Sequence, residues 1–248
     1  MRIIFVMMII LGACSQLSPE NISPEPPVED NWTVVASGLE QDTIRNGATI
    51  FQAVRIDPTQ YTFRAHYRPN APLTLAEWQA ELPNAEVIIN ANFFTPENTV
   101  LGLLIADSVR YGTSYTNRGA TFFVDGTSVG IRSNITQPYQ VEAYTQAIQA
   151  FPMLVGDGLA TYNNSADTAI SRRTVIAQDE QGHIILMVTS GFGLSLYDLS
   201  QYLPTTDLNI VDALNLDGGG STMMSIASSE TTVLSLDPVP VVLAIYPN

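Results

Sequence analysis

The residues with the clearest potential for chemistry lie in segment 216–222, which reads Leu-Asp-Gly-Gly-Gly-Ser-Thr. Three consecutive glycines lose much backbone entropy on folding, so such a run is typical of a corner that needs positive φ angles or close approach to a ligand. Their backbone N–H groups could form an anion-binding nest, with further donors if Ser221 caps a helix. Asp217, at the end of an expected strand, would place a carboxylate beside these donors. The same residues also fit an ordinary tight turn capped by Asp217.

Three further positions could contribute to one site. Asn90 and Asn92 follow an apolar run and precede two Phe residues, a setting in which an amide could hold sugar hydroxyls or simply form a turn. Arg173 stands just before an expected strand, where its guanidinium could bind phosphate or carboxylate in a bidentate manner; a surface Arg pair is the alternative. Asp157 lies in a Gly-Asp-Gly turn, which by itself indicates a hairpin.

Composition excludes several classes of function. The net charge is -14, with 24 acidic and 10 basic residues, and this field repels nucleic acid and anionic membrane surfaces. The chain contains no Lys, which excludes Schiff-base chemistry and a P-loop lysine. Its two His residues, His66 and His183, argue against a His-rich zinc site, and no G-x-S-x-G motif supports a Ser–His–Asp triad.

Taken in order along the chain, these motifs resemble the phosphodiester glycosidase family from about residue 32 to the C-terminus. The segments that carry the resemblance are 90–94, 102–105, 151–158, 173–174, 194–203 and 215–222. The last of these reproduces the family's Leu-Asp-Gly-Gly-Gly-Ser signature. Ala91 and Asn92 replace two small Gly residues of the usual motif, Ala177 stands where Gly is common, and an Asp-Gly-Arg turn is missing at Thr189 to Gly191.

The resemblance implies hydrolysis of a sugar 1-phosphodiester to sugar and phosphomonoester. On this hypothesis Arg173 contacts the phosphate, and Asp217 stabilises an oxocarbenium-like centre or activates water. Asp157 is the best candidate for a second carboxylate. The remaining predicted substrate contacts come from Asn90, Asn92, Gly218, Gly219, Gly220, Ser221 and Thr222. The chemistry requires no cofactor.

Two other interpretations stay open. Asp217 and Asp157 could be ligands of Ca²⁺ or Mg²⁺, although the D-x-D-x-D-G calcium loop is absent. Alternatively, the chain could be a non-catalytic carbohydrate-binding lipoprotein of the cell envelope. The pair Arg173 and Asp217 favours catalysis, because simple sugar binding does not require it, whereas the missing Asp-Gly-Arg turn favours binding.

The N-terminus is typical of an exported lipoprotein. Residues 1–13 combine one Arg, an apolar run too short to span a bilayer, and small residues, as in a signal peptide. Leu-Gly-Ala-Cys at 11–14 resembles the lipobox of bacterial lipoproteins, which implies cleavage before Cys14 and its acylation. Residues 14–31 predict a Pro- and Glu-rich tether to a domain at 32–248. The expected location is the bacterial cell envelope, at the outer membrane if the bacterium has two, with the membrane contacted only through the lipid anchor.

Short alternating runs predict one α+β domain around a single mixed, mostly antiparallel sheet with a few short helices. Strands are expected at about 48–56, 61–67, 86–90, 100–105, 121–124, 174–178, 183–189, 213–216 and 239–246. Helices are expected after Thr74 and Ser195, where capping boxes occur, and over 142–151.

Overall fold

The computed structural model describes residues 31–248, of which Trp32–Asn248 form one compact unit. The predicted signal peptide, Cys14 and nearly all of the predicted tether lie outside the described residues. Within residues 31–248, no helix has the length and apolar character needed to cross a bilayer.

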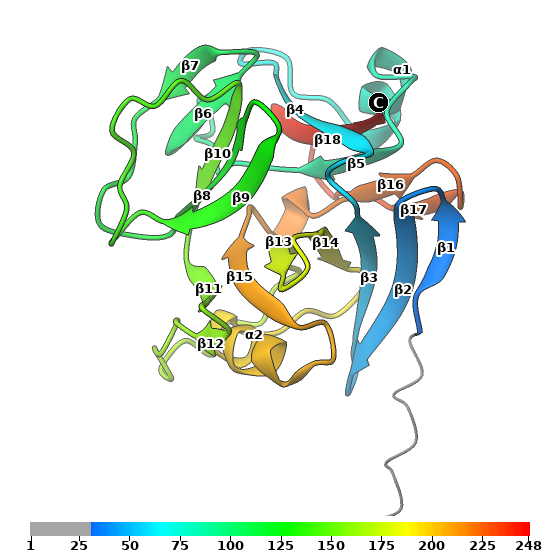
Figure 1. Cartoon of the computed structure of the whole chain (residues 1–248), viewed down its shortest axis with the longest axis vertical. Helices are drawn as coiled ribbons and strands as arrows, with labels where there is room; N and C mark the ends of the chain where they lie inside the picture. The colour runs from blue at the N-terminus through cyan, green and yellow to red at the C-terminus, as the bar shows by residue number, and fades with distance from the viewer. Residues whose placement is uncertain (1–30) are drawn as a thin grey trace, which may run out of the picture. The chain divides into compact units, whose positions relative to one another are not determined.

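Three antiparallel sheets build this unit, in place of the single mixed sheet expected from the sequence (Figure 1). The eight-stranded sheet runs in the order β1 (Thr33–Ala36), β2 (Leu39–Asn46), β3 (Thr49–Ile56), β14 (Ile184–Thr189), β13 (Thr174–Asp179), β15 (Ile210–Asn215), β11 (Met153–Gly156), β12 (Leu159–Ala160). Several sequential neighbours, such as β2 and β3 or β13 and β14, are joined by short turns. Such turns impose antiparallel pairing, because a parallel pair needs a long crossover.

The other two sheets have five strands each. One runs β7 (Val109–Gly112), β6 (Leu103–Ala106), β10 (Gln146–Ala150), β8 (Ala120–Asp125), β9 (Ser128–Ser133). The other runs β17 (Thr231–Val233), β16 (Met224–Ile226), β5 (Val87–Asn90), β18 (Val241–Pro247), β4 (Tyr61–Tyr67). Figure 1 shows the β6–β10 sheet and the β4–β18 sheet on one side of the eight-stranded sheet.

The main hydrophobic core lies where the three sheets face one another. Leu214 of the eight-stranded sheet, Leu243 of the β18 sheet and Ile148 of the β10 sheet all belong to this one cluster and are buried. A strand presents alternate residues to its two faces, so the opposite face of the eight-stranded sheet needs separate cover. Helix α2 (Leu196–Tyr202) provides it, packing Leu199 against residues that include Val175.

The two α-helices begin where the sequence predicts. Thr74 caps α1 (Leu75–Glu81) through a reciprocal capping box with Glu77, and Ser195 caps α2 by accepting a bond from the Asp198 N–H. The helix expected over 142–151 is wrong: residues Gln146–Ala150 form β10. All five residues of β10 are buried because the strand lies between β6 and β8, so its sequence shows no two-residue alternation that would have revealed a strand.

Candidate active site

The acidic corner at Asp217 follows directly from β15. After Asn215 the chain crosses to the segment that follows β5, where the Asp217 N–H donates to the Ala91 carbonyl at 3.0 Å. The side chain of Asn90, the last residue of β5, donates to the Asp217 carbonyl at 2.6 Å. The end of β5 therefore holds both the N–H and the carbonyl of Asp217, a residue that β15 of another sheet leads into.

Asn90 is the buried centre of this junction. Its Oδ1 atom accepts bonds from the Thr174 hydroxyl at 2.9 Å and from the Met223 N–H at 3.0 Å. The Thr174 hydroxyl also lies 3.3 Å from that of Thr222. Asn90 and Thr222 were both predicted as substrate contacts. Their polar side-chain atoms instead form bonds within the chain, and these bonds hold the loop that carries Asp217.

Conformation or close packing favours glycine at each position of the corner. Gly219 has φ +60°, a left-handed conformation that favours glycine. A Cβ atom on Gly218 would lie 2.6 Å from the backbone oxygen of Arg172, and one on Gly220 would overlap the carboxylate of Asp237 unless that side chain moved. Two of the glycine N–H groups are already bonded, Gly218 to the Asp217 carboxylate at 2.9 Å and Gly219 to the Arg172 carbonyl at 2.9 Å.

The sequence suggested that Ser221 could cap a helix, but no α-helix follows it. Gly219–Ser221 form a single 3-10 turn, and the chain continues into strand β16. The helix-dipole contribution to anion binding is therefore absent from this corner of the described chain. Ser221 instead hydrogen-bonds to the Asp217 side chain.

The Asp217 carboxyl has a strongly perturbed acidity. Burial raises its pKa to about 6, while hydrogen bonds from Ser221 and from the Gly218 N–H act in the opposite direction. Desolvation disfavours the charged form of a carboxyl, and here it outweighs two bonds that favour that form. A carboxyl that titrates near neutrality can exchange a proton during a reaction.

The backbone of Arg173 lies beside the Asp217 corner, and its guanidinium forms no ion pair with the Asp217 carboxylate. The pairing of β13 with β15 joins Val175 to Asn215, and the Leu216 N–H donates to the Thr174 carbonyl, so the same register continued by two residues brings Arg173 opposite Asp217. The guanidinium donates through Nε to the Leu194 carbonyl and through Nη2 to the Ala169 carbonyl, both at 2.8 Å.

These two bonds fix the direction of the Arg173 side chain. The residue is 8% exposed, and burial lowers its pKa, opposed by the charges of Asp167 and Tyr162. A guanidinium has five N–H donors, so two carbonyl contacts leave donors for a further ligand.

The side chain of Asn92 is buried against strands β6 and β10. Its amide nitrogen donates to the carbonyls of Leu103 and Gln149, both at 3.1 Å, whereas its Oδ1 atom has no hydrogen-bond partner. The Oδ1 atom of Asn215, two residues before Asp217, is also buried without a partner. Unpaired buried acceptors are rare, and both of these oxygens are enclosed by the folded chain.

Asp157 does not join this site. It forms the β11–β12 turn with Gly158, whose N–H donates to the Val211 carbonyl near the start of β15, while Asp217 follows the end of β15. Five residues of strand separate Asp212, which is next to Asp157, from Asp217, or about 16 Å. A paired carboxylate mechanism and a shared cation both need much shorter separations, so the structure brings Asp157 and Asp217 together for neither.

A different acidic residue reaches the corner. Asp237, in the loop between β17 and β18, donates its N–H to the Gly220 carbonyl at 3.2 Å, and its carboxylate fills the space beside the Gly220 Cα. Sequence reasoning missed it because no motif surrounds it. Within residues 31–248, no group of three or more His, Cys, Asp or Glu residues is arranged to hold a metal ion.

The site thus combines a partly buried carboxyl at a glycine-rich strand end with an arginine whose backbone lies on the neighbouring strand. Residues 83–246, well over half of the chain, match the family model described as phosphodiester glycosidase. The chain belongs to the phosphodiester glycosidase family, and the resemblance inferred from its motifs is confirmed.

Known relatives agree with this assignment. Human N-acetylglucosamine-1-phosphodiester alpha-N-acetylglucosaminidase is 28% identical over 169 residues, which cover 58% of this chain and 32% of the human protein. The chain therefore spans about a third of that relative. The zebrafish catalytic domain of the same name, described as auto-inhibited by its pro-peptide, has a TM-score of 0.64 at 19% identity, covering 85% of this chain and 82% of that one. A hypothetical protein from Synechocystis has a TM-score of 0.65 at 17% identity, covering 86% and 63%.

Proposed function

We propose that this protein hydrolyses a sugar 1-phosphodiester or a related glycoconjugate at the glycosidic bond. The observation that carries the proposal is the Asp217 carboxyl, partly buried at the glycine corner with its pKa raised to about 6 and Arg173 next to it in register. Membership of the phosphodiester glycosidase family and the name of the human relative give the reaction class.

In this mechanism Asp217 accepts a proton from water as the water oxygen attacks the anomeric carbon. The bond from that carbon to the phosphate oxygen breaks, and its electron pair leaves with the phosphomonoester. Phosphate is a good leaving group, so the main requirement is stabilisation of its developing charge. Arg173 supplies that stabilisation through the N–H groups that do not bond to the Leu194 and Ala169 carbonyls.

Asp237 takes the role of second carboxylate in this proposal. Its side chain borders the glycine corner, whereas that of Asp157 lies at the other end of β15. Asn90, Thr174 and Thr222 act as positioning residues, because their polar atoms are bonded to one another and to the loop. Substitution of Asp237 by Asn should therefore lower turnover more than the same substitution of Asp157.

The reaction is tested with a panel of sugar 1-phosphodiesters, scoring free sugar and free phosphomonoester. In ¹⁸O-labelled water, attack at the anomeric carbon places the label in the sugar, and attack at phosphorus places it in the phosphate. We expect label in the sugar. Absence of turnover on the whole panel, with glycan binding intact, would contradict the proposal.

The pH dependence tests the role of Asp217. A general base must be ionised, so kcat/KM should fall about tenfold for each pH unit below a pKa near 6 and level off above it. A profile that instead falls above pH 6 would assign Asp217 as a general acid.

A non-catalytic carbohydrate-binding function remains the second candidate. It is favoured by the engagement of Asn90, Gly218 and Gly219 in bonds within the chain, which leaves fewer groups for a transition state than the sequence suggested. Glycan affinity unchanged by Asp217→Asn, with no turnover in either protein, would support it.

The proposed location is the bacterial cell envelope, through acylation of Cys14. The support is the signal-like run at 1–13 and the lipobox-like residues before Cys14. Incorporation of labelled fatty acid into the wild-type protein and not into Cys14→Ser tests the proposal.

A further inference from the structure

A hollow of about 380 Å³ opens beside the cluster of aromatic residues at the end of β10. Phe151, Pro152 and Met153 form one wall, and Arg118 and Tyr162 border it. Most of this lining is apolar, and the exposed side chain of Ile135 extends it. A hollow of this size fits a single aromatic ring or a short apolar chain with an attached polar group.

Arg118 supplies the positive charge of this hollow. Its guanidinium lies 4.7 Å from the centre of the Tyr115 ring and 4.8 Å from that of Phe151. Among residues 31–248 this guanidinium forms no ion pair, although the chain carries 24 acidic residues. Two rings thus orient a cation toward the hollow without neutralising it.

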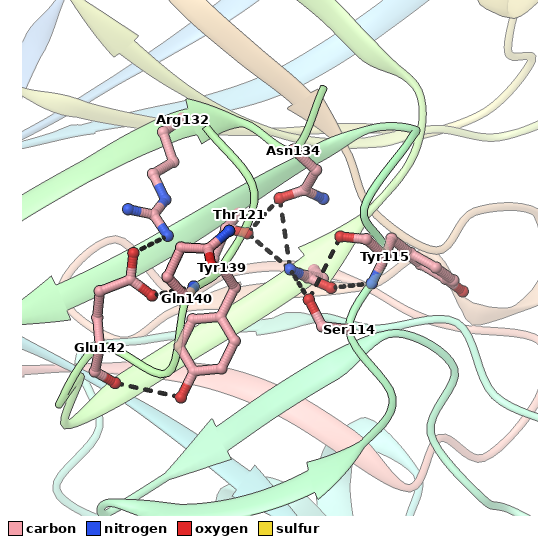
Figure 2. A network of polar contacts seen from close by, with 9 residues as sticks. Ser114, Tyr115, Thr121, Arg132, Asn134, Tyr139, Gln140 and Glu142 are labelled. Carbon is pink, nitrogen blue, oxygen red and sulfur yellow. Dashed lines mark hydrogen bonds and ion pairs between the residues drawn. The ribbon is translucent and has the colours of Figure 1, made fainter. Parts of the chain in front are cut away.

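A buried polar network fixes the backbone at Tyr115, the residue whose ring lies under the Arg118 guanidinium. The Tyr115 N–H donates to Gln149 Oε1 at 2.7 Å, and the Gln149 amide donates to Ser114 and Thr121, both at 3.0 Å. Figure 2 shows Ser114, Tyr115, Thr121 and Asn134 around this network. Gln149 is fully buried, so the loop that carries Tyr115 and Arg118 is held to β10. The geometry of the cation is therefore built into the fold.

The hollow adjoins the Asp217 corner. Asn215 donates through its side chain to the Phe151 carbonyl at 3.0 Å and through its N–H to the Pro152 carbonyl at 3.1 Å. Asp217 follows two residues later, at most about 7 Å along the chain. On the other side, the Tyr162 hydroxyl donates to Asp167 at 3.0 Å, and Arg173 donates to the carbonyl of Ala169 at 2.8 Å, two residues further along the chain. Short chain segments thus connect the hollow to both residues that the proposed reaction uses.

We propose that this hollow is the aglycone subsite, which binds an aromatic or otherwise apolar group esterified to the phosphate, with Arg118 in contact with a phosphate oxygen. The inference rests on the proposed function. It adds the part of the substrate beyond the phosphate, which should be apolar because a polar aglycone would lose hydrogen bonds against this lining. The net charge of -14 repels anions at a distance, so a local guanidinium is needed to hold one.

Direct binding tests the subsite without turnover. Phenyl phosphate is titrated by calorimetry into the wild-type protein and into the Arg118→Gln variant. Inorganic phosphate separately probes the contact with Arg118, and phenol separately probes the apolar lining. Arg45→Gln is the matched control, because Arg45 is an exposed arginine of β2 that does not line the hollow. Ile135→Glu, an exposed position in the wall, places a negative charge there without disturbing the core, and Val109→Glu is its exposed control on β7.

We expect phenyl phosphate to bind more tightly than phosphate or phenol, and Arg118→Gln and Ile135→Glu each to weaken it about tenfold or more, while both controls bind as wild type. Equal affinity for phenyl phosphate and inorganic phosphate, or equal effects of Arg118→Gln and Arg45→Gln, would overturn the subsite. If these binding results hold while no phosphodiester is turned over, the subsite stands and the proposed hydrolysis fails.

Discussion

The Asp-Gly turns at Asp157 and Asp217 both follow an apolar strand, and they lie at opposite ends of β15. At Asp157 both turn residues have positive φ angles, 50° and 76°, as in the tight hairpin that joins β11 to β12. At Asp217 the chain leaves one sheet for another, and the carboxyl is enclosed by segments from β5, β13 and the loop at Asp237.

The comparison shows that glycine beside aspartate has two separate uses. In the Asp157 turn, glycine allows the chain to reverse, and the carboxylate is exposed to water. At the Asp217 corner, glycine allows other backbone to approach within van der Waals contact, and that approach desolvates the carboxyl. Burial raises the pKa of Asp217 in the second environment, and we therefore assign chemistry to that turn.

The largest expected difference between the two turns is in activity. Asp217→Asn should lower kcat/KM by about 10³ or more, since it removes the proposed base, and each factor of ten corresponds to about 1.4 kcal/mol of transition-state stabilisation. Asp157→Asn should stay within about threefold of wild type. Steady-state kinetics on the best phosphodiester of the panel measures both. Comparable losses in the two variants would remove the distinction between the turns.

The substitution Asp217→Asn, which should lower activity, should raise the free energy of unfolding at high pH. The folded-state pKa of Asp217, about 6, lies above the ordinary pKa of 3.8 for an aspartate carboxyl. Between these values the unfolded chain releases a proton that the folded chain keeps, so the free energy of unfolding falls as pH rises through this window and then levels off. The cost at pH 8 is about 3 kcal/mol.

Asp217→Asn should relieve that cost at pH 8 and give little change near pH 3, where the carboxyl is protonated in both states. Asp157→Asn is the matched control, because it makes the same substitution at an exposed carboxylate. Denaturant unfolding of the three proteins at the two pH values measures the effect. An Asp217→Asn protein less stable than wild type at pH 8 would show that burial does not dominate at this carboxyl.

The smallest expected difference concerns the neighbouring glycines. Gly218→Ala places a Cβ 2.6 Å from the backbone oxygen of Arg172, which can move only with β13, and should cost about 2 kcal/mol or more. Gly158→Ala meets only the Ile210 oxygen at 3.9 Å and carries the strain of φ +76°, about 1 kcal/mol. Thermal unfolding of both variants ranks them. The reverse order would mean that backbone strain outweighs close packing.

Much of the fold followed from local patterns. Alternating apolar residues located β3, β4 and the β13–β14 hairpin, and Thr74 and Ser195 located the starts of both α-helices. The patterns failed at β10, because a strand buried on both faces loses its two-residue period. They also did not reveal that the strands divide among three sheets, since that depends on pairing between distant segments.

The candidate site, like the fold, was predicted in part from the sequence. The glycine corner and the Arg-Thr start of β13 attracted attention by residue type, and the structure joins their backbones. The sequence placed Asn90 among substrate contacts, whereas its buried amide is used within the fold. It also selected Asp157 by its glycine neighbours and overlooked Asp237, whose role depends on the loop that returns to Gly220.

The sequence alone determined the family, the positions of most strands and the identity of the acidic glycine corner, because these depend on residue type and short-range spacing. Tertiary structure decided which carboxyl is desolvated, which arginine lies beside it and which asparagines keep a free oxygen. Solvation and unpaired polar atoms depend on what packs around a group, and the packing here comes from segments more than a hundred residues apart in the chain.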